Sequence, residues 1–158
     1  MITALRNALF CTSVKQQPNG QVDILGIRPD SLTYSQRPWL ETLDLFLTVD
    51  FDGKGAKGHV QLDAPHYVHR VPFAAPAGIT STGMFFTLTI PIVEPGFFTV
   101  SVVDGANRTR PFKVKWKLGF DPKAENLGDE KAADLIRFCN EETEKLLSSL
   151  HGRAPETH

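Results

Sequence analysis

Several features that would narrow the function of this chain are scarce in its sequence. It has two cysteines, Cys11 and Cys139, which stand far apart. This predicts free thiols in a reducing compartment and argues against a small disulfide-stabilised scaffold. No apolar run approaches the ~18 residues that a membrane-spanning helix requires, and the first residues lack the charged and apolar regions of a signal peptide. We therefore expect a cytoplasmic protein with no membrane partner.

Neither sign of charge is in excess. Lysine and arginine together number 17 and aspartate and glutamate 18, which gives a formal net charge of -1. A domain that attracts nucleic acid through its overall field usually has a basic excess, so nucleic acid is not expected as a main partner. Polar aromatic residues are also few, with 2 Trp and 2 Tyr against 11 Phe. Phenylalanine suits the dry space between two sheets.

Alternating apolar and polar residues predict that most of the chain forms strands. The clearest segment is 43–52, where apolar side chains at odd positions alternate with mostly polar ones; this period of two is typical of a half-buried strand. The pattern recurs at 84–92, 98–102 and 112–118, with turn residues such as Pro95-Gly96 between segments. Roughly seven or eight such strands without a helical period between them predict an antiparallel β-sandwich, immunoglobulin-like or C2-like.

Glycine and proline define the remaining segments of the sandwich. The turn Pro18-Asn19-Gly20 predicts a hairpin between the apolar runs 4–14 and 22–27. The polar segment 28–40 contains two prolines and is predicted to be a loop. A later proline-rich region is predicted to hold at most a short strand, at 67–71.

The composition changes after residue 119, and the following segment predicts one amphipathic helix. Asp129 is a suitable N-cap, and Pro155 lies beyond the helix end. One stripe at helical spacing contains Ala132, Leu135, Ile136, Cys139, Thr143, Leu146, Leu147 and Leu150. The predicted organisation is a sandwich domain over 1–118, a linker over 119–128, the helix over 129–150 and a flexible tail over 151–158. The stripe must be covered, either by the chain's own sheet or by a second copy or another partner.

Two parts of the sequence resemble a known family. The opening Ala8-Leu9-Phe10-Cys11, the turn Asn19-Gly20 and the run Ile24-Leu25-Gly26-Ile27 are similar to the ALxCD…NGKLSLIGI opening of uncharacterised bacterial proteins, a domain of unknown function. A PGxYxFxVxxDG…LPLxV segment of that family is mirrored by the residues 95–105 and 111–114. The chain departs from the pattern at Thr12, where the family often has Asp. The resemblance covers roughly residues 5–118 and implies a bacterial or phage-like intracellular β-sandwich, with no activity attached.

Two groups of side chains are weak candidates for a metal site. They are Asp50, Asp52 and Asp63 in the first group, and His59, His66 and His69 in the second. Carboxylates on loops bind calcium in some sandwiches, but calcium requires about six to eight oxygen ligands. Three imidazoles could bind zinc, yet a spacing of three along a strand sends two of them to opposite faces. Solvated carboxylates and exposed histidines are the plainer interpretation, and no metal or other cofactor is predicted.

The sequence contains no evident catalytic arrangement. A Gly-x-Ser-x-Gly elbow is missing, and neither cysteine stands in a recognisable catalytic context. The segment 53–58 fits G-x-G-x-x-G, but this motif binds a nucleotide only where a helix follows it, and here another strand is predicted. We therefore predict that the protein is not an enzyme.

A row of cations is the most distinctive predicted surface. Lys113, Lys115 and Lys117 alternate with apolar residues on one strand, and Arg108 and Arg110 precede them. Such a row could bind an acidic protein surface or phosphates, although lysines on an edge strand also prevent aggregation. Few exposed aromatic residues are expected beside the lysines, which disfavours single-stranded nucleic acid.

These observations favour a non-catalytic binding or assembly module that contacts a protein partner or a second copy of itself. The predicted contact residues are Arg108, Arg110, Lys113, Lys115, Lys117, Leu135, Leu146 and Leu150. Two alternatives stay open. One is a small-molecule or metal-binding enzyme built on the region from Asp50 to His69, and the other is weak nucleic-acid binding through the strand from Lys113 to Lys117.

Overall fold

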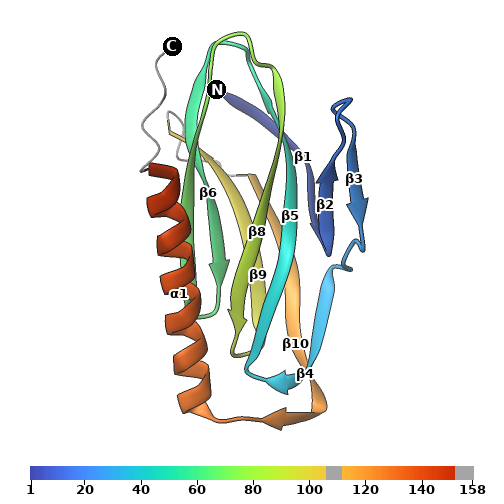
Figure 1. The fold of residues 1–158 in the computed structure, drawn as a ribbon, viewed down its shortest axis with the longest axis vertical. Coiled ribbons are helices and arrows are strands. Elements are labelled where there is room, and N and C mark those ends of the chain that lie inside the picture. Colours follow the sequence, from blue (N-terminus) through green and yellow to red (C-terminus); the bar gives the residue numbers. More distant parts are fainter. Residues whose placement is uncertain (106–111, 152–158) are drawn as a thin grey trace.

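Two β-sheets pack face to face, and a helix runs along their common side (Figure 1). This computed structural model describes residues 1–105 and 112–151, with side chains up to residue 146. The strands are β1 Ile2–Cys11, β2 Ser13–Gln16, β3 Val22–Leu25, β4 Ser31–Arg37, β5 Trp39–Phe51, β6 Ala56–Ala64, β7 Tyr67–Ala75, β8 Ser81–Ile92, β9 Gly96–Asp104 and β10 Phe112–Asn126, and the helix is α1 Asp129–His151. The predicted mainly-β sandwich with a C-terminal helix is confirmed.

The two sheets differ in size and in strand direction. One has three antiparallel strands in the order β1-β5-β8, and the other has five in the order β4-β10-β9-β6-β7. In the larger sheet every neighbouring pair is antiparallel except β4 and β10, which are parallel. The longer strands follow the period-two alternation closely. On β5 the apolar side chains from Leu43 to Phe51 at odd positions are buried, whereas those between them are only partly buried.

Three aromatic rings hold the sheets together at the centre of the core. Phe10 of β1 lies 4.1 Å from Trp116 of β10 and 4.9 Å from Phe98 of β9, measured between ring centroids. All three side chains are almost fully buried. Tilted aromatic rings in close contact attract one another, and this attraction adds to the stabilisation from burying their apolar surface. This contact fixes β1 of the smaller sheet against β9 and β10 of the larger one.

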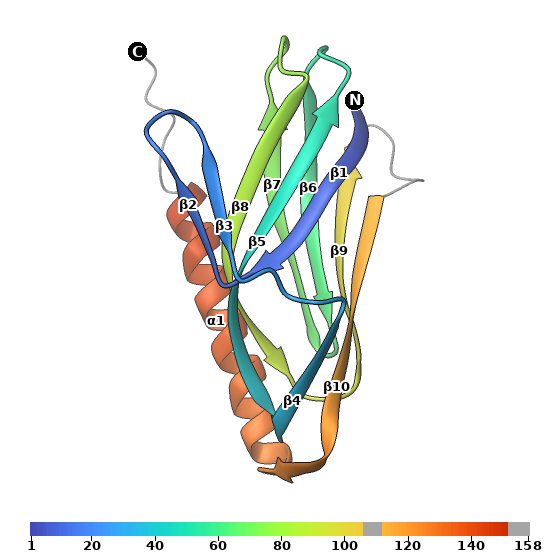
Figure 2. The same ribbon diagram turned by 90° about the vertical axis from the view of Figure 1, so that its right-hand side faces the viewer.

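The predicted hairpin between residues 4–14 and 22–27 is confirmed for β2 and β3, which pair antiparallel around the turn at residues 17–21. Gly20 has a φ of +84°, which glycine adopts without the steric cost that a side chain would add. The predicted first strand divides at Thr12, so that β1 enters the three-stranded sheet and β2 leaves it. Figure 2 shows the hairpin projecting from the sandwich.

The prediction of a loop over residues 28–40 is wrong, because Ser31–Arg37 forms β4. Only two apolar residues, Leu32 and Tyr34, mark this strand in the sequence, and both are buried. Its partner is the second part of β10, from Lys117 to Asn126. Residues 119–126, expected in a linker, therefore belong to a strand whose backbone groups pair with β4.

The helix packs within the chain, against the outer edges of both sheets. It contacts β8, the last strand of the smaller sheet, and β7, the last strand of the larger one. Cys139 is completely buried in this contact and belongs to the main core. Covering both edges satisfies the requirement that an apolar helix stripe be buried. Within the described residues, no helix has the length and apolar character needed to cross a membrane.

Candidate binding surface

The lysine row lies on the outer face of the five-stranded sheet. Lys113, Lys115 and Lys117 are exposed, and the residues that alternate with them face the core. Their strand, β10, pairs with β9 on one side and β4 on the other. The pairing with β4 begins only at Lys117, so among the described residues Lys113 and Lys115 lie on a part of β10 that is paired with β9 alone. Protection of this sheet edge is therefore one explanation of these two lysines, whereas Lys117 lies within the sheet.

Other cations share this outer face. Lys57 on β6 and Arg70 on β7 are exposed and alternate with buried residues in the same sense as the lysine row. We call Lys57, Arg70, Lys113, Lys115 and Lys117 the cationic face. One acidic residue, Asp63, is found among the outward-facing residues of β6, β7, β9 and the segment 112–118. In the part of the chain that the structure describes, no carboxylate lies within ion-pair distance of these five cations.

An exposed aromatic ring stands at one end of the cationic face. Phe97 on β9 is directly opposite Lys117 and is 53% exposed. The ammonium nitrogen of Lys115 lies 5.6 Å from the centre of the Phe97 ring, which is a cation–π distance. The expectation of few exposed aromatic residues beside the lysines is therefore wrong at this position. The alternation itself marks Phe97, because the next residue, Phe98, faces the core.

A shallow hollow lies at the side of the cationic face. Its volume is about 610 Å³, and its lining residues are His59, Gln61, Arg70, Pro72, Val103, Asp104 and Gly105. The guanidinium of Arg70 is held beside the hollow, since its Nε donates to the Gln61 side-chain oxygen at 3.2 Å. An imidazole and a guanidinium here add hydrogen-bond donors to the surface.

The other predicted contact residues lie elsewhere or outside the described part. Arg108 and Arg110 fall in the segment 106–111, outside the described residues, as does the side chain of Leu150. Leu135 is half-buried on the side of α1 that carries Cys139. Leu146 is exposed and borders a hollow of about 180 Å³ between α1 and the sandwich. The helix leucines and the lysine row therefore do not form one continuous surface.

The three candidate aspartates are not brought together. Asp50 and Asp63 lie on β5 and β6, which belong to different sheets and do not form a hairpin. The carboxylate of Asp50 forms an ion pair with Arg6 at 2.8 Å, and Asp63 lies on the outer face of β6. Within the described residues, no group of three or more His, Cys, Asp or Glu side chains is placed to hold a metal ion.

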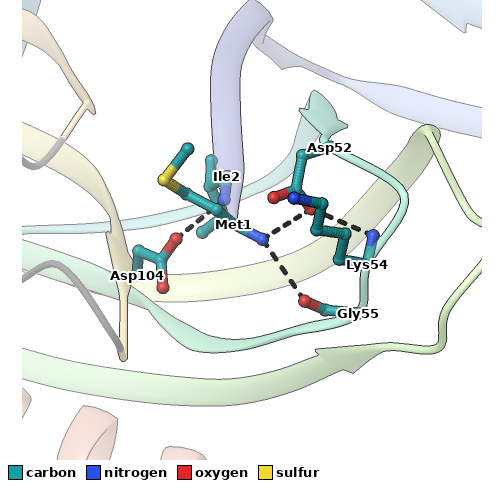
Figure 3. Close-up of polar contacts among 6 residues, drawn as sticks. All are labelled: Met1, Ile2, Asp52, Lys54, Gly55 and Asp104. Atoms are coloured by element: carbon teal, nitrogen blue, oxygen red, sulfur yellow. Dashed lines mark hydrogen bonds and ion pairs between the residues drawn. The ribbon is translucent and has the colours of Figure 1, made fainter.

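Asp52 instead anchors the first residues of β1 (Figure 3). Its carboxylate accepts a hydrogen bond from the Met1 amine at 2.9 Å and another from the Lys54 backbone N–H at 3.0 Å. These bonds to the charged form, led by the one from the amine, lower the pKa of Asp52. One residue further on, the backbone N–H of Ile2 donates to the buried Asp104 carboxylate at 2.7 Å. Together these contacts tie β1 to the β5–β6 loop and to β9.

The three histidines also lie apart. His66 is in the β6–β7 turn at a φ of +63° and pairs with Glu94 at 3.3 Å. His69 faces the helix, where its Nε2 lies 2.8 Å from the Asn140 side-chain oxygen. His59 faces outward at the hollow. The three imidazoles are therefore not brought together in one site.

An apolar row on the smaller sheet was also missed by the sequence reasoning. Leu9, Phe46 and Phe85 lie in register on the outer sides of β1, β5 and β8. Phe85 is 48% exposed. The signal was present, because Phe46 occupies a position where the alternation of β5 otherwise places polar residues.

No protein-family model matches the chain, and no curated protein matches it either.

Proposed function

We propose that the protein is a non-catalytic binding module that contacts an acidic protein partner through the cationic face. The observation that carries this proposal is the row of three exposed ammonium groups beside the exposed ring of Phe97, without a carboxylate partner among the described residues. Lysines two apart on a strand are separated by about 7 Å, so they repel one another. The carboxylates of an acidic partner would reduce this repulsion and would attract the ammonium groups.

The arrangement has the elements of a protein-binding surface. Aromatic residues and arginine are enriched where binding energy concentrates, and charged groups around them set orientation and association rate. Phe97 supplies an aromatic group, and Lys115 and Lys117 lie beside it. The neighbouring side chains of Thr99 and Gln61 add neutral polar groups, and Asp63 adds one carboxylate opposite Thr99.

A second candidate function is binding of single-stranded nucleic acid. The specific observation in its favour is Phe97, since an exposed ring beside cations can stack on a base. One ring is a small platform, and the net charge of -1 supplies no attractive field for a polyanion. The alternative of an enzyme built on the region from Asp50 to His69 has no comparable support, because its aspartates and histidines lie apart.

Fluorescence anisotropy with the full chain tests the proposal. The probes are a labelled oligoglutamate peptide and a labelled oligothymidine of equal charge, each at about 20 mM and about 300 mM salt. We expect the peptide to bind at low salt and Lys115→Glu to weaken it by about tenfold or more. The matched control is Lys15→Glu on the β2–β3 hairpin, which changes the net charge equally.

Equal weakening by Lys115→Glu and Lys15→Glu would show that only net charge matters, and it would contradict the proposal. Absence of peptide binding at low salt would contradict it as well. Tighter binding of the oligothymidine, weakened by Phe97→Ala, would favour the nucleic-acid function instead.

A further inference from the structure

The exposed face of the helix carries the opposite charge to the cationic face. Glu130, Asp134, Glu141 and Glu144 are exposed and lie on the side of α1 opposite the buried Cys139, since their spacings of four, seven and three residues follow the helical period. We call these four residues the acidic stripe. Arg137 and Lys145 also lie on this side of the helix, where Arg137 forms an ion pair with Asp134 and Lys145 one with Glu142. The other three carboxylates of the stripe have no ion-pair partner within the described residues.

We propose that the partner of the cationic face is a second copy of this chain, which docks through its acidic stripe. The inference rests on the proposed function and names the partner of the same surface. Its basis is charge complementarity between two surfaces of one chain, each with charges that the described part of the molecule leaves unpaired.

The two surfaces match in length. The row from Lys113 to Lys117 spans about 13 Å at ~3.3 Å per strand residue. On the helix, Asp134 and Glu141 are about 10 Å apart and Asp134 and Glu144 about 15 Å apart, at ~1.5 Å per residue. A helix laid along β10 therefore brings carboxylates near all three ammonium groups.

Each surface also has an exposed aromatic residue close to its charges. Phe138 is 43% exposed, one residue after Arg137 on α1, and Phe97 stands beside the lysine row. Aromatic groups that become buried between copies would add apolar contact area to the charge pairing. An interface with an aromatic centre and a charged rim is the usual arrangement.

One molecule cannot join the two surfaces internally. The helix covers the β7 edge, and β6 and β9 separate β7 from β10 in the five-stranded sheet. The contact therefore uses different patches on the two copies, which is a heterologous interface that generates a closed ring or an open chain of molecules.

The test is sedimentation of the full chain at concentrations up to about 1 mM in about 20 mM and about 500 mM salt. We expect association at low salt that disappears at high salt. The variants Lys115→Glu/Lys117→Glu and Glu141→Lys/Glu144→Lys should each weaken association by about tenfold or more. An equimolar mixture of the two variants should associate again, because each reversed surface then meets a complementary one.

The control variant Lys15→Glu/Asp23→Lys exchanges two charges that face each other on the β2–β3 hairpin, away from both surfaces, and should associate like the original chain. Thermal unfolding of every variant checks that the fold is retained. A full chain that stays monomeric at low salt, or variants that fail to associate when mixed, would overturn the inference. If Lys115→Glu still weakens the oligoglutamate peptide in that case, the proposed function stands and only the second copy is wrong as the partner.

Discussion

The hydroxyl group of Tyr67, on β7, lies 2.9 Å from the hydroxyl group of Thr143, on α1. Two residues further along β7, His69 lies 2.8 Å from Asn140, almost one turn earlier in the helix. The two bonds hold α1 at a fixed position along β7, and the helix and the strand run in the same direction (Figure 2). The polar bonds thus specify the position of a helix that Cys139 and the apolar residues hold in place.

Replacing Tyr67 by Phe should remove one of these bonds while keeping the ring in the core. We expect the free energy of unfolding to fall by about 1 kcal/mol, measured by urea denaturation. Thr143→Val is the matching change on the helix. In a double-mutant cycle, Tyr67→Phe/Thr143→Val should cost less than the sum of the single changes. Strict additivity would mean that the two hydroxyls do not interact.

Alkaline conditions should destabilise the fold through Cys139. Burial, helped by the nearby Glu142 carboxylate, raises the pKa of the Cys139 thiol from 9.0 to about 11. The folded protein therefore holds this proton at a pH where the unfolded chain has lost it. The stabilisation is complete below pH 9.0 and is lost as the pH rises towards about 11.

Urea denaturation across this pH range measures the effect. The free energy of unfolding should fall with a slope of up to about 1.4 kcal/mol per pH unit for each such group. Burial also raises the pKa of Cys11, Tyr34 and Tyr67, so the slope in the original chain combines several groups. Cys139→Ala should reduce the slope, and an unchanged slope in this variant would exclude Cys139 as a contributor.

Gly58 should not tolerate a side chain. A Cβ at this position would lie 2.2 Å from the backbone oxygen of Val103 on the paired strand β9. Gly58→Ala must therefore push β6 and β9 apart, and we expect a loss of about 2–4 kcal/mol in unfolding free energy. Gly119→Ala is the control, because a Cβ there meets no atom within 4 Å. Similar melting temperatures for the two variants would contradict the placement of Gly58.

Phe97→Ala should separate binding from stability. The ring is 53% exposed, so its loss should change the unfolding free energy by no more than about 0.5 kcal/mol. Binding of the oligoglutamate peptide should nevertheless weaken by roughly threefold to tenfold, because the ring orders the Lys115 ammonium group. Phe85→Ala, which removes another half-exposed phenylalanine from the other sheet, should leave peptide binding unchanged.

The strands with strong alternation were predictable, and those without it were not. Leu43 to Phe51 shows the period of two directly, because one side of β5 faces the core and the other does not. β4 has only Leu32 and Tyr34 as apolar residues, and the prolines on either side suggested a loop. Its pairing depends on residues more than eighty positions away in β10, which no local pattern can reveal.

The candidate surface was predictable in part for the same reason. The exposure of Lys113, Lys115 and Lys117 follows from alternation with apolar neighbours, so their shared face could be recognised in advance. Their position in the sheet depends on strand order and register, which place Lys117 between β9 and β4 and leave Lys113 and Lys115 paired with β9 alone among the described residues. Strand order also separates Asp52 from Asp63, which sequence proximity had suggested would lie together.

The arrangement of α1 across β7 and β8 has a consequence for biosynthesis. Roughly 60 residues lie between the end of β8 and the end of α1, and a ribosome that adds about 5–20 residues per second needs several seconds to make them. Until then a nascent chain exposes two strand edges that have no cover, and such edges readily join those of other chains. We therefore expect incomplete chains to depend on chaperones during translation far more than finished ones do.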